Sequence, residues 1–203
     1  MVLELAKSEH PLLTQKLEEF DFKNPPVDPV ELANTLIETL KAKRGMGLSA
    51  NQVGLPHRVF VLWSEKPFVC FNPRIVDVST ETNLLEEGCL SFPHLLIKIK
   101  RPAIIKVRFE NAFGETQTEK FVGMTARAFL HELDHMDGVL FQSRANRIHL
   151  DRALHQQKVL TRRLKRGEVT IRPGIMTESQ LKDAQLSIRT SDKMMSIASE
   201  ISV

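Results

Sequence analysis

The sequence predicts an α+β protein in which mixed or antiparallel strands pack around a central metal-binding helix, followed by a C-terminal helix and an extension. Three observations support this class. Apolar residues recur at helical spacing over residues 28–43. Compact or alternating apolar runs, which are typical of strands, occupy residues 58–122. The segment that follows these runs has helix-forming residues and carries two histidines four positions apart.

Residues 1–27 are predicted to form an N-terminal arm, and the first long helix follows it. Asp28 and Pro29 are typical of a helix start, with a capping side chain and proline at the first helical position. The helical pattern continues to Lys43. It ends in a glycine-rich segment, residues 45–52, where glycine allows close approach of the backbone to a ligand or a positive φ.

The strand-rich part contains six predicted strands. Asn72 and Pro73 are predicted to turn the chain between the second and third strands. The fourth alternates isoleucine with lysine, which indicates one buried and one exposed face. The last two are predicted to form a hairpin. In chain order the predicted strands are 59–63, 68–71, 75–78, 97–100, 104–109 and 116–122.

The helix after the strands carries an H-E-x-x-H pattern. On a helix, His131 and His135 lie on one face, one turn apart, where both imidazoles can bind one metal ion. Glu132 lies beside the first of them and can act as a base toward water activated by the metal. Gly138 stands where a C-terminal cap is expected. Catalytic zinc or iron usually has three protein ligands, so the chain has to supply a third.

The better candidate for the third ligand is Cys89. It follows two carboxylates at a predicted strand end, and a thiolate with two imidazoles suits zinc or ferrous iron. Cys70 lies within an apolar run and is predicted to be a small core residue. The first residues do not read as an export signal, so free thiols or a metal thiolate are favoured over a disulfide, and a cytoplasmic location is expected.

The composition is ordinary for a soluble globular protein, with 42% hydrophobic and 26% charged residues. No apolar run approaches the roughly 18–20 residues that span a bilayer. The net charge of +3 is unevenly distributed, because eight basic residues between Arg144 and Arg166 face only Asp151. Two interpretations of this basic segment stay open: a polyanionic partner such as RNA, or a solvated helix face.

The basic segment is predicted to form a helix over residues 148–166, with Leu150, Leu154, Leu160 and Leu164 as its apolar contacts. Gly167 marks the expected end of the globular body. We therefore predict a catalytic domain at residues 1–166 and an extension at 167–203. Within the extension, a capping-box pattern predicts a short helix over 177–188.

Three blocks of the sequence resemble, in the right order, the three signature motifs of the peptide deformylases. Residues 45–52 resemble G-x-G-L-A-A-x-Q, residues 87–91 match E-G-C-L-S, and residues 131–135 match H-E-x-D-H. The resemblance covers roughly residues 8–165. It implies a metal-dependent hydrolase that removes the formyl group from the N-terminal formylmethionine of new polypeptides and releases formate.

The resemblance also implies a role for each residue at a motif position. It gives metal binding to Cys89, His131 and His135, and the role of general acid/base to Glu132. It gives oxyanion binding to the side-chain amide of Gln52 and the backbone N–H of Leu90. It gives contacts with the substrate backbone to Met46, Gly47 and Gly88, and a supporting position behind the histidines to the pair of Asp134 and Arg101. Ser49 departs from the motif, which usually has alanine there, and we expect this small replacement to have little effect.

The implied cofactor is one divalent metal ion per chain, ferrous iron in the cell, with zinc or nickel as alternatives. The implied partners are N-formylmethionyl peptides and nascent chains. Docking on the ribosome through the basic helix 144–166 is compatible with this activity. No membrane or DNA partner is expected.

Two other functions are compatible with parts of the sequence. An endopeptidase of the H-E-x-x-H type needs a downstream ligand; His149 and Glu168 are available, but Cys89 would then have no role. A non-catalytic ribosome- or RNA-binding module would use the basic helix and keep a vestigial metal site. The presence of Gln52 and Glu132 beside all three ligands argues against lost catalysis.

Overall fold

The computed structural model describes residues 1–169, which form an α+β fold, and this confirms the predicted class. The strands form two antiparallel sheets, so the arrangement is antiparallel rather than mixed. In chain order the elements are η1 (Pro11–Thr14), α1 (Pro29–Lys43), β1 (Gly47–Ser49), η2 (Ala50–Val53), β2 (Val59–Trp63), β3 (Pro67–Val78), β4 (Thr82–Cys89), β5 (Phe92–Pro102), β6 (Ile104–Glu110), β7 (Thr116–Val122), α2 (Gly123–Met136), η3 (Phe141–Arg144) and α3 (Arg147–Lys165).

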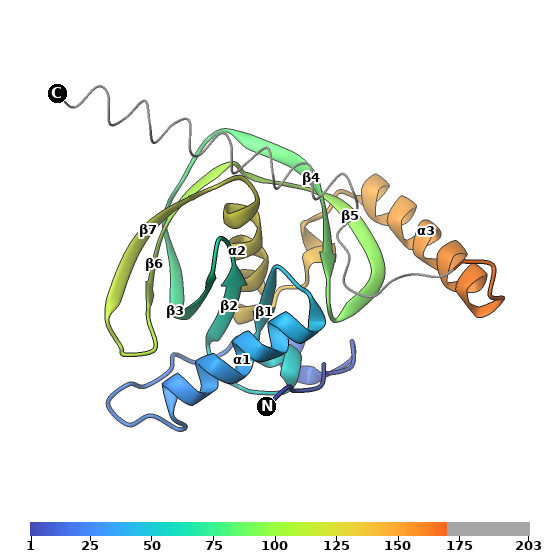
Figure 1. Cartoon of the computed structure of the whole chain (residues 1–203). Coiled ribbons are helices and arrows are strands. Elements are labelled where there is room, and N and C mark those ends of the chain that lie inside the picture. Colours follow the sequence, from blue (N-terminus) through green and yellow to red (C-terminus); the bar gives the residue numbers. More distant parts are fainter. Residues whose placement is uncertain (170–203) are drawn as a thin grey trace.

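The two sheets surround helix α2, which carries the H-E-x-x-H pattern. The larger sheet has the strand order β1-β2-β3-β6-β7, and the smaller one pairs β4 with β5. Figure 1 shows α2 at the centre with strands on either side of it, while α1 lies along β1 and β2 and α3 extends beside β5. The helix is therefore held between the two sheets, and side chains from both can reach it.

Three apolar clusters fix these elements. The first joins α2 to the large sheet, where the rings of Phe129 and Phe60 pack edge to face with their centroids 5.1 Å apart. The second joins α1 to β1 and β2 through buried leucines and valines. The third joins β5 to α3, and there Ile97 and Ile99 are fully buried while the lysines between and after them are exposed. The alternation in β5 is thus confirmed.

The start of α1 is confirmed at the predicted residue. The Asp28 side chain caps the helix by accepting hydrogen bonds from the backbone N–H groups of Val30 at 2.8 Å and Glu31 at 3.0 Å. These contacts satisfy two of the donors that a helix start leaves unpaired. The predicted hairpin is also confirmed, as β6 and β7.

The predicted turn at Asn72 and Pro73 is wrong. The chain continues through both residues as the single strand β3, with a shift of register between Phe71 and Arg74. Asn72 has a φ of 48° and exchanges hydrogen bonds with the backbone of Phe20 in the N-terminal arm, at 2.7 and 2.9 Å. A β-bulge accommodates both a proline and a left-handed asparagine, so the same residues that commonly form a turn here bend a strand.

The predicted apolar contacts of α3 need one correction. Leu154 is 44% exposed, and its neighbour Ala153 is the buried residue that faces β5. The helix itself is confirmed, with Asn146 as its cap. The predicted helix at 177–188 lies outside the described residues. Within residues 1–169, no helix combines the length and the apolar character that crossing a bilayer requires.

Candidate metal centre

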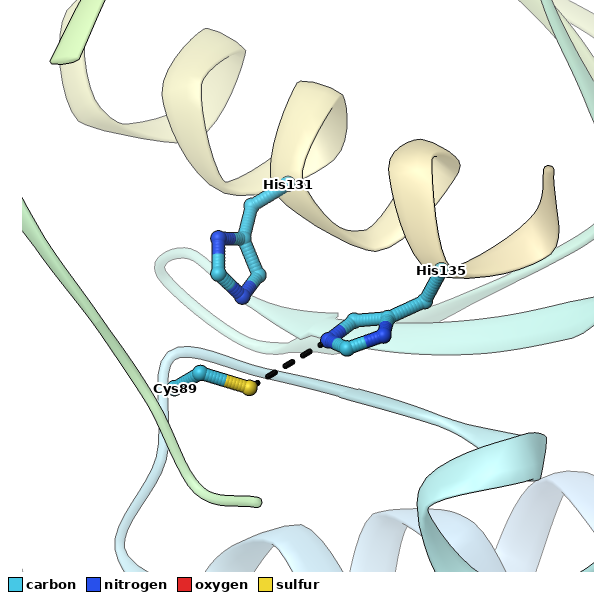
Figure 2. A group of neighbouring side chains, drawn as sticks. All are labelled: Cys89, His131 and His135. Atoms are coloured by element: carbon cyan, nitrogen blue, oxygen red, sulfur yellow. Dashed lines mark hydrogen bonds between the residues drawn. The ribbon is translucent and has the colours of Figure 1, made fainter. Parts of the chain in front are cut away.

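Cys89, His131 and His135 meet between the small sheet and α2. One potential ligand atom from each residue lies within 4.8 Å of the other two, and Cys89 Sγ is 3.3 Å from His135 Nε2. Figure 2 shows both imidazoles projecting from one side of α2, with the cysteine facing them. Cys89 lies at the end of β4, where a register shift after Glu87 alters the direction of the strand.

A buried carboxylate fixes the first histidine. Glu87 Oε2 lies 3.2 Å from His131 Nδ1, which leaves Nε2 as the ring nitrogen available to a metal ion. Burial disfavours the ionised form of Glu87, but hydrogen bonds from His131 and Arg101 outweigh it and lower its pKa to about 2. Burial also lowers the pKa of His135, which favours the neutral imidazole that binds metals.

Two buried arginines hold Glu87 in place. Arg101 donates from Nε to Glu87 Oε1 at 2.7 Å and from Nη2 to Glu87 Oε2 at 2.9 Å. Its Nη1 donates to Asp134 Oδ2 at 2.8 Å, so Arg101 links the two carboxylates behind the histidines. Arg127 donates to Glu87 Oε1, and Arg144 donates to Asp134 Oδ1 at 2.6 Å. Breaking such a network leaves a buried charge without a partner, which costs about 3–5 kcal/mol.

Replacing Glu87 by glutamine is expected to weaken metal binding by roughly 10–100-fold, because the amide no longer fixes His131 as an anion does. The measurement is competition between the protein and a chelator of known affinity. Glu86→Gln is the matched control, since Glu86 is the adjacent carboxylate in β4 and none of the ion pairs within residues 1–169 includes it. Equal affinity of both variants would contradict the prediction.

Glu132 lies beside the three candidate ligands and is only 4% exposed. Its Oε2 accepts a hydrogen bond from the Ser49 hydroxyl group in β1. A Cβ atom added to Gly47 would lie 2.4 Å from Glu132 Oε1, so the backbone of β1 approaches this carboxylate closely. Burial raises the pKa of Glu132. A carboxyl group with a raised pKa beside a metal site is suited to exchange protons near neutral pH.

The Gln52 side chain points at the same site. The Ser49 backbone N–H donates to Gln52 Oε1 at 2.9 Å, which turns the amide nitrogen toward the candidate ligands. Gln52 Nε2 then lies 3.3 Å from Cys89 Sγ and 3.1 Å from Ser91 Oγ. A buried amide in this fixed orientation can donate to a negatively charged oxygen in the site.

A cleft of about 260 Å³ opens onto these groups. Its lining includes Met46, Gly47, Gly88 and Leu90, which come from two chain segments that precede α2. The remaining wall includes the apolar side chains of Phe92, Leu95, Leu96, Met124 and Ala128 beside charged ones such as Arg44 and Glu86. The cleft can therefore receive an extended chain together with an apolar side chain.

The eleven residues to which the resemblance gives a role line this cleft, belong to the cluster of Cys89 with the two histidines, or lie directly behind these histidines. The contacts made by Glu87, Ser49, Ser91 and Arg127 were not predicted from the sequence. Two signals were present: Glu87 begins the motif that contains Cys89, and Arg127 lies one helical turn before His131. Neither His149 nor Glu168, the ligands that an endopeptidase would need, belongs to the cluster.

The chain matches the model of a protein family described as polypeptide deformylase over residues 2–151. It is 44% identical over 110 residues to a peptide deformylase of Thermotoga neapolitana. The aligned region covers 54% of this chain and 67% of the relative. It is 35% identical over 150 residues to a peptide deformylase of Desulforudis audaxviator. Here the aligned region covers 73% of this chain and 96% of the relative.

Solved structures are similar as well. The crystal structure of peptide deformylase from Thermotoga maritima superposes with a TM-score of 0.66 at 35% identity, covering 72% of this chain and 99% of that one. The structure of a peptide deformylase from Synechococcus elongatus in complex with actinonin superposes with a TM-score of 0.70 at 30% identity, covering 77% and 86% of the two chains.

Proposed function

Because this chain belongs to the polypeptide deformylase family, we propose that Cys89, His131 and His135 bind its catalytic metal ion and that Glu132 exchanges the protons of the reaction. The enzyme removes the N-formyl group from the N-terminal formylmethionine of nascent polypeptides and releases formate. The observation that carries the assignment is the approach of the three ligand atoms to within 4.8 Å of one another, with Glu132 buried beside them.

The donor set fits a divalent metal ion. One thiolate and two imidazoles suit zinc or ferrous iron, and the contact between Glu87 and His131 Nδ1 orients His131 as a ligand. When bound, the ion supplies Lewis-acid chemistry that lowers the pKa of a water molecule to about 7. We propose ferrous iron as the ion used in the cell, with zinc or nickel as substitutes that the same donors accept.

The chain's own residues account for the remaining steps. Glu132 takes a proton from the attacking water and delivers it to the leaving amine. As attack proceeds the formyl oxygen becomes negative, and Gln52 Nε2 and the Leu90 backbone N–H donate to it. Loss of one such donor typically costs about 3–4 kcal/mol. Asp134 and Arg101 hold the histidine-bearing helix in position through their 2.8 Å contact.

The substrate is proposed to bind in an extended form. Met46, Gly47 and Gly88 line the cleft and would pair with the peptide backbone in the manner of strands. The apolar wall formed by Leu95, Leu96 and neighbouring side chains would receive the methionine side chain. The formyl carbon carries only hydrogen, so a tight site excludes the larger acetyl group by size.

The test of this function is formate release from a formyl-Met-Ala-Ser peptide, under anaerobic conditions with ferrous iron. Stoichiometric formate with an intact Met-Ala bond is the expected result. Absence of formate from protein that carries one metal ion per chain would overturn the proposal in favour of a binding module. Cleavage between residues would instead indicate an endopeptidase.

We also propose that residues 1–166 form the catalytic domain, that residues 167–203 form an extension, and that the enzyme acts in the cytoplasm on chains emerging from the ribosome. Docking would use the basic segment 144–166. The support for docking is that α3 packs through Ala153 and leaves most of its basic side chains exposed, among them Arg152 and Lys158. An exposed row of cations attracts the phosphate groups of RNA.

Replacing both Arg152 and Lys158 by glutamine is expected to weaken ribosome binding by about tenfold at low salt, because each phosphate contact contributes to affinity. Formate release from a short peptide should be unchanged. The matched control replaces Lys106 and Lys120, two exposed lysines that face each other across β6 and β7. Equal co-sedimentation of both double variants with ribosomes would refute docking through α3.

A further inference from the structure

We propose that Ser49 is a positioning residue for the general base, and that its hydroxyl group sets the orientation in which Glu132 meets the water and the leaving amine. This inference rests on the proposed role of Glu132. It replaces the expectation from the sequence that serine and alanine are equivalent at this position. The Ser49 hydroxyl group donates a hydrogen bond to Glu132, and alanine has no group that could make this contact.

The contact joins distant parts of the chain inside the protein. Ser49, the last residue of β1, has no solvent exposure, and its Oγ donates to Oε2 of Glu132, 83 residues away on α2. Both side chains are buried, and water therefore competes little for the carboxylate. Hydrogen bonds to an ionised acceptor are roughly twice as strong as those between neutral groups.

The other carboxylate oxygen is held as well. Glu132 Oε1 lies against the Gly47 backbone, where an added Cβ would be 2.4 Å away. The carboxylate is thus held between a hydroxyl donor and a glycine, both from the three-residue strand β1. A general base that is fixed in one orientation keeps more of the rate advantage of proximity. A base that samples several orientations keeps less of it.

Ser49 acts on the oxyanion donor through a different atom. Its backbone N–H donates to Gln52 Oε1 at 2.9 Å. Replacing Ser49 by alanine removes the hydroxyl contact to Glu132, together with the capping contact of the same hydroxyl group to the Gln52 backbone N–H. It keeps the Ser49 backbone N–H contact that orients the Gln52 side-chain amide. The substitution therefore separates the positioning of the base from the orientation of the amide.

The test is the kinetics of Ser49→Ala with the metal content matched to that of the wild type. We expect kcat to fall about tenfold while KM changes less than twofold, because the substrate-backbone contacts are unaffected. In a Glu132→Gln background the same substitution should have no further effect on kcat, since Ser49 acts through Glu132. Ser49→Gly, which also lacks the hydroxyl, should behave alike if the alanine variant folds poorly.

Thr39→Val is the matched control. Thr39 is a fully buried hydroxyl residue in α1 whose Oγ1 donates to the Thr35 carbonyl and accepts from the Leu3 backbone, away from the cleft. Its replacement should lower stability and leave kcat unchanged.

An unchanged kcat in Ser49→Ala, or an equal loss in both backgrounds, would overturn the role of Ser49. Retained activity of Glu132→Gln alone would instead overturn the proposed role of Glu132. The two failures are therefore distinguishable.

Discussion

Replacing Glu132 by glutamine is expected to reduce kcat for formate release by about 10³-fold and to leave the bound metal in place. Glutamine has nearly the same shape as glutamate, and its amide oxygen can still accept from the Ser49 hydroxyl group. It cannot take a proton from water or return one to the amine. General acid–base catalysis by one group typically contributes about 10²–10⁴-fold.

The measurement compares kcat of the variant and the wild type at equal metal content, determined by elemental analysis of the same samples. Thermal unfolding provides the control for folding, because Glu132 is buried and a destabilised variant would lose activity for another reason. Activity above one tenth of the wild-type value, with metal fully bound, would show that another group exchanges the protons.

The helices and the hairpin could be predicted because their signals are local. The Asp28 cap, the apolar spacing of α1 and the alternation in β5 each depend on residues within a few positions. The strand β3 could not, because Asn72 and Pro73 are common in turns and also in bulges. Whether a turn or a bulge forms at these residues depends on the contacts with Phe20, which lies 52 residues away in the sequence.

The same distinction between local signals and contacts over long distances in the sequence applies to the candidate metal centre. The cluster of Cys89, His131 and His135 could be predicted because thiolate and imidazole groups are common metal ligands and the two histidines have the spacing of a helical metal motif. Of the contacts behind them, the pair of Asp134 and Arg101 was expected from the resemblance. The contact of Arg127 with Glu87 was not predicted, since it joins residues 40 positions apart. Of β4, only the end near Cys89 was predicted. The rest of the strand has no alternation of apolar residues, because its one buried residue is the charged Glu87.

Replacing Gly47 by alanine is expected to lower kcat/KM by about 10²-fold or more, because accurate placement of catalytic groups makes a contribution of that size. The added Cβ would lie 2.4 Å from Glu132 Oε1 and 2.8 Å from its Cδ and Cγ atoms, and real Cβ atoms essentially never approach so closely. The Glu132 side chain would have to leave its contact with Ser49. The added methyl group would also narrow the cleft at a proposed substrate-backbone contact.

Gly54→Ala provides the matched control, because Gly54 has the strained backbone that Gly47 lacks and lacks the close contact that Gly47 has. Gly54 has a φ of 78° and no atom within 4 Å of an added Cβ, whereas Gly47 does not have a left-handed backbone. Alanine at 54 should therefore lower stability by about 1–2 kcal/mol and leave kcat/KM unchanged.

Alanine at 47 should show the reverse profile, with a large loss of activity and a small change in the unfolding temperature. If alanine at 47 left kcat/KM within threefold of the wild type, the close approach of β1 would not be what holds Glu132, and the Ser49 hydroxyl group would have to do so alone.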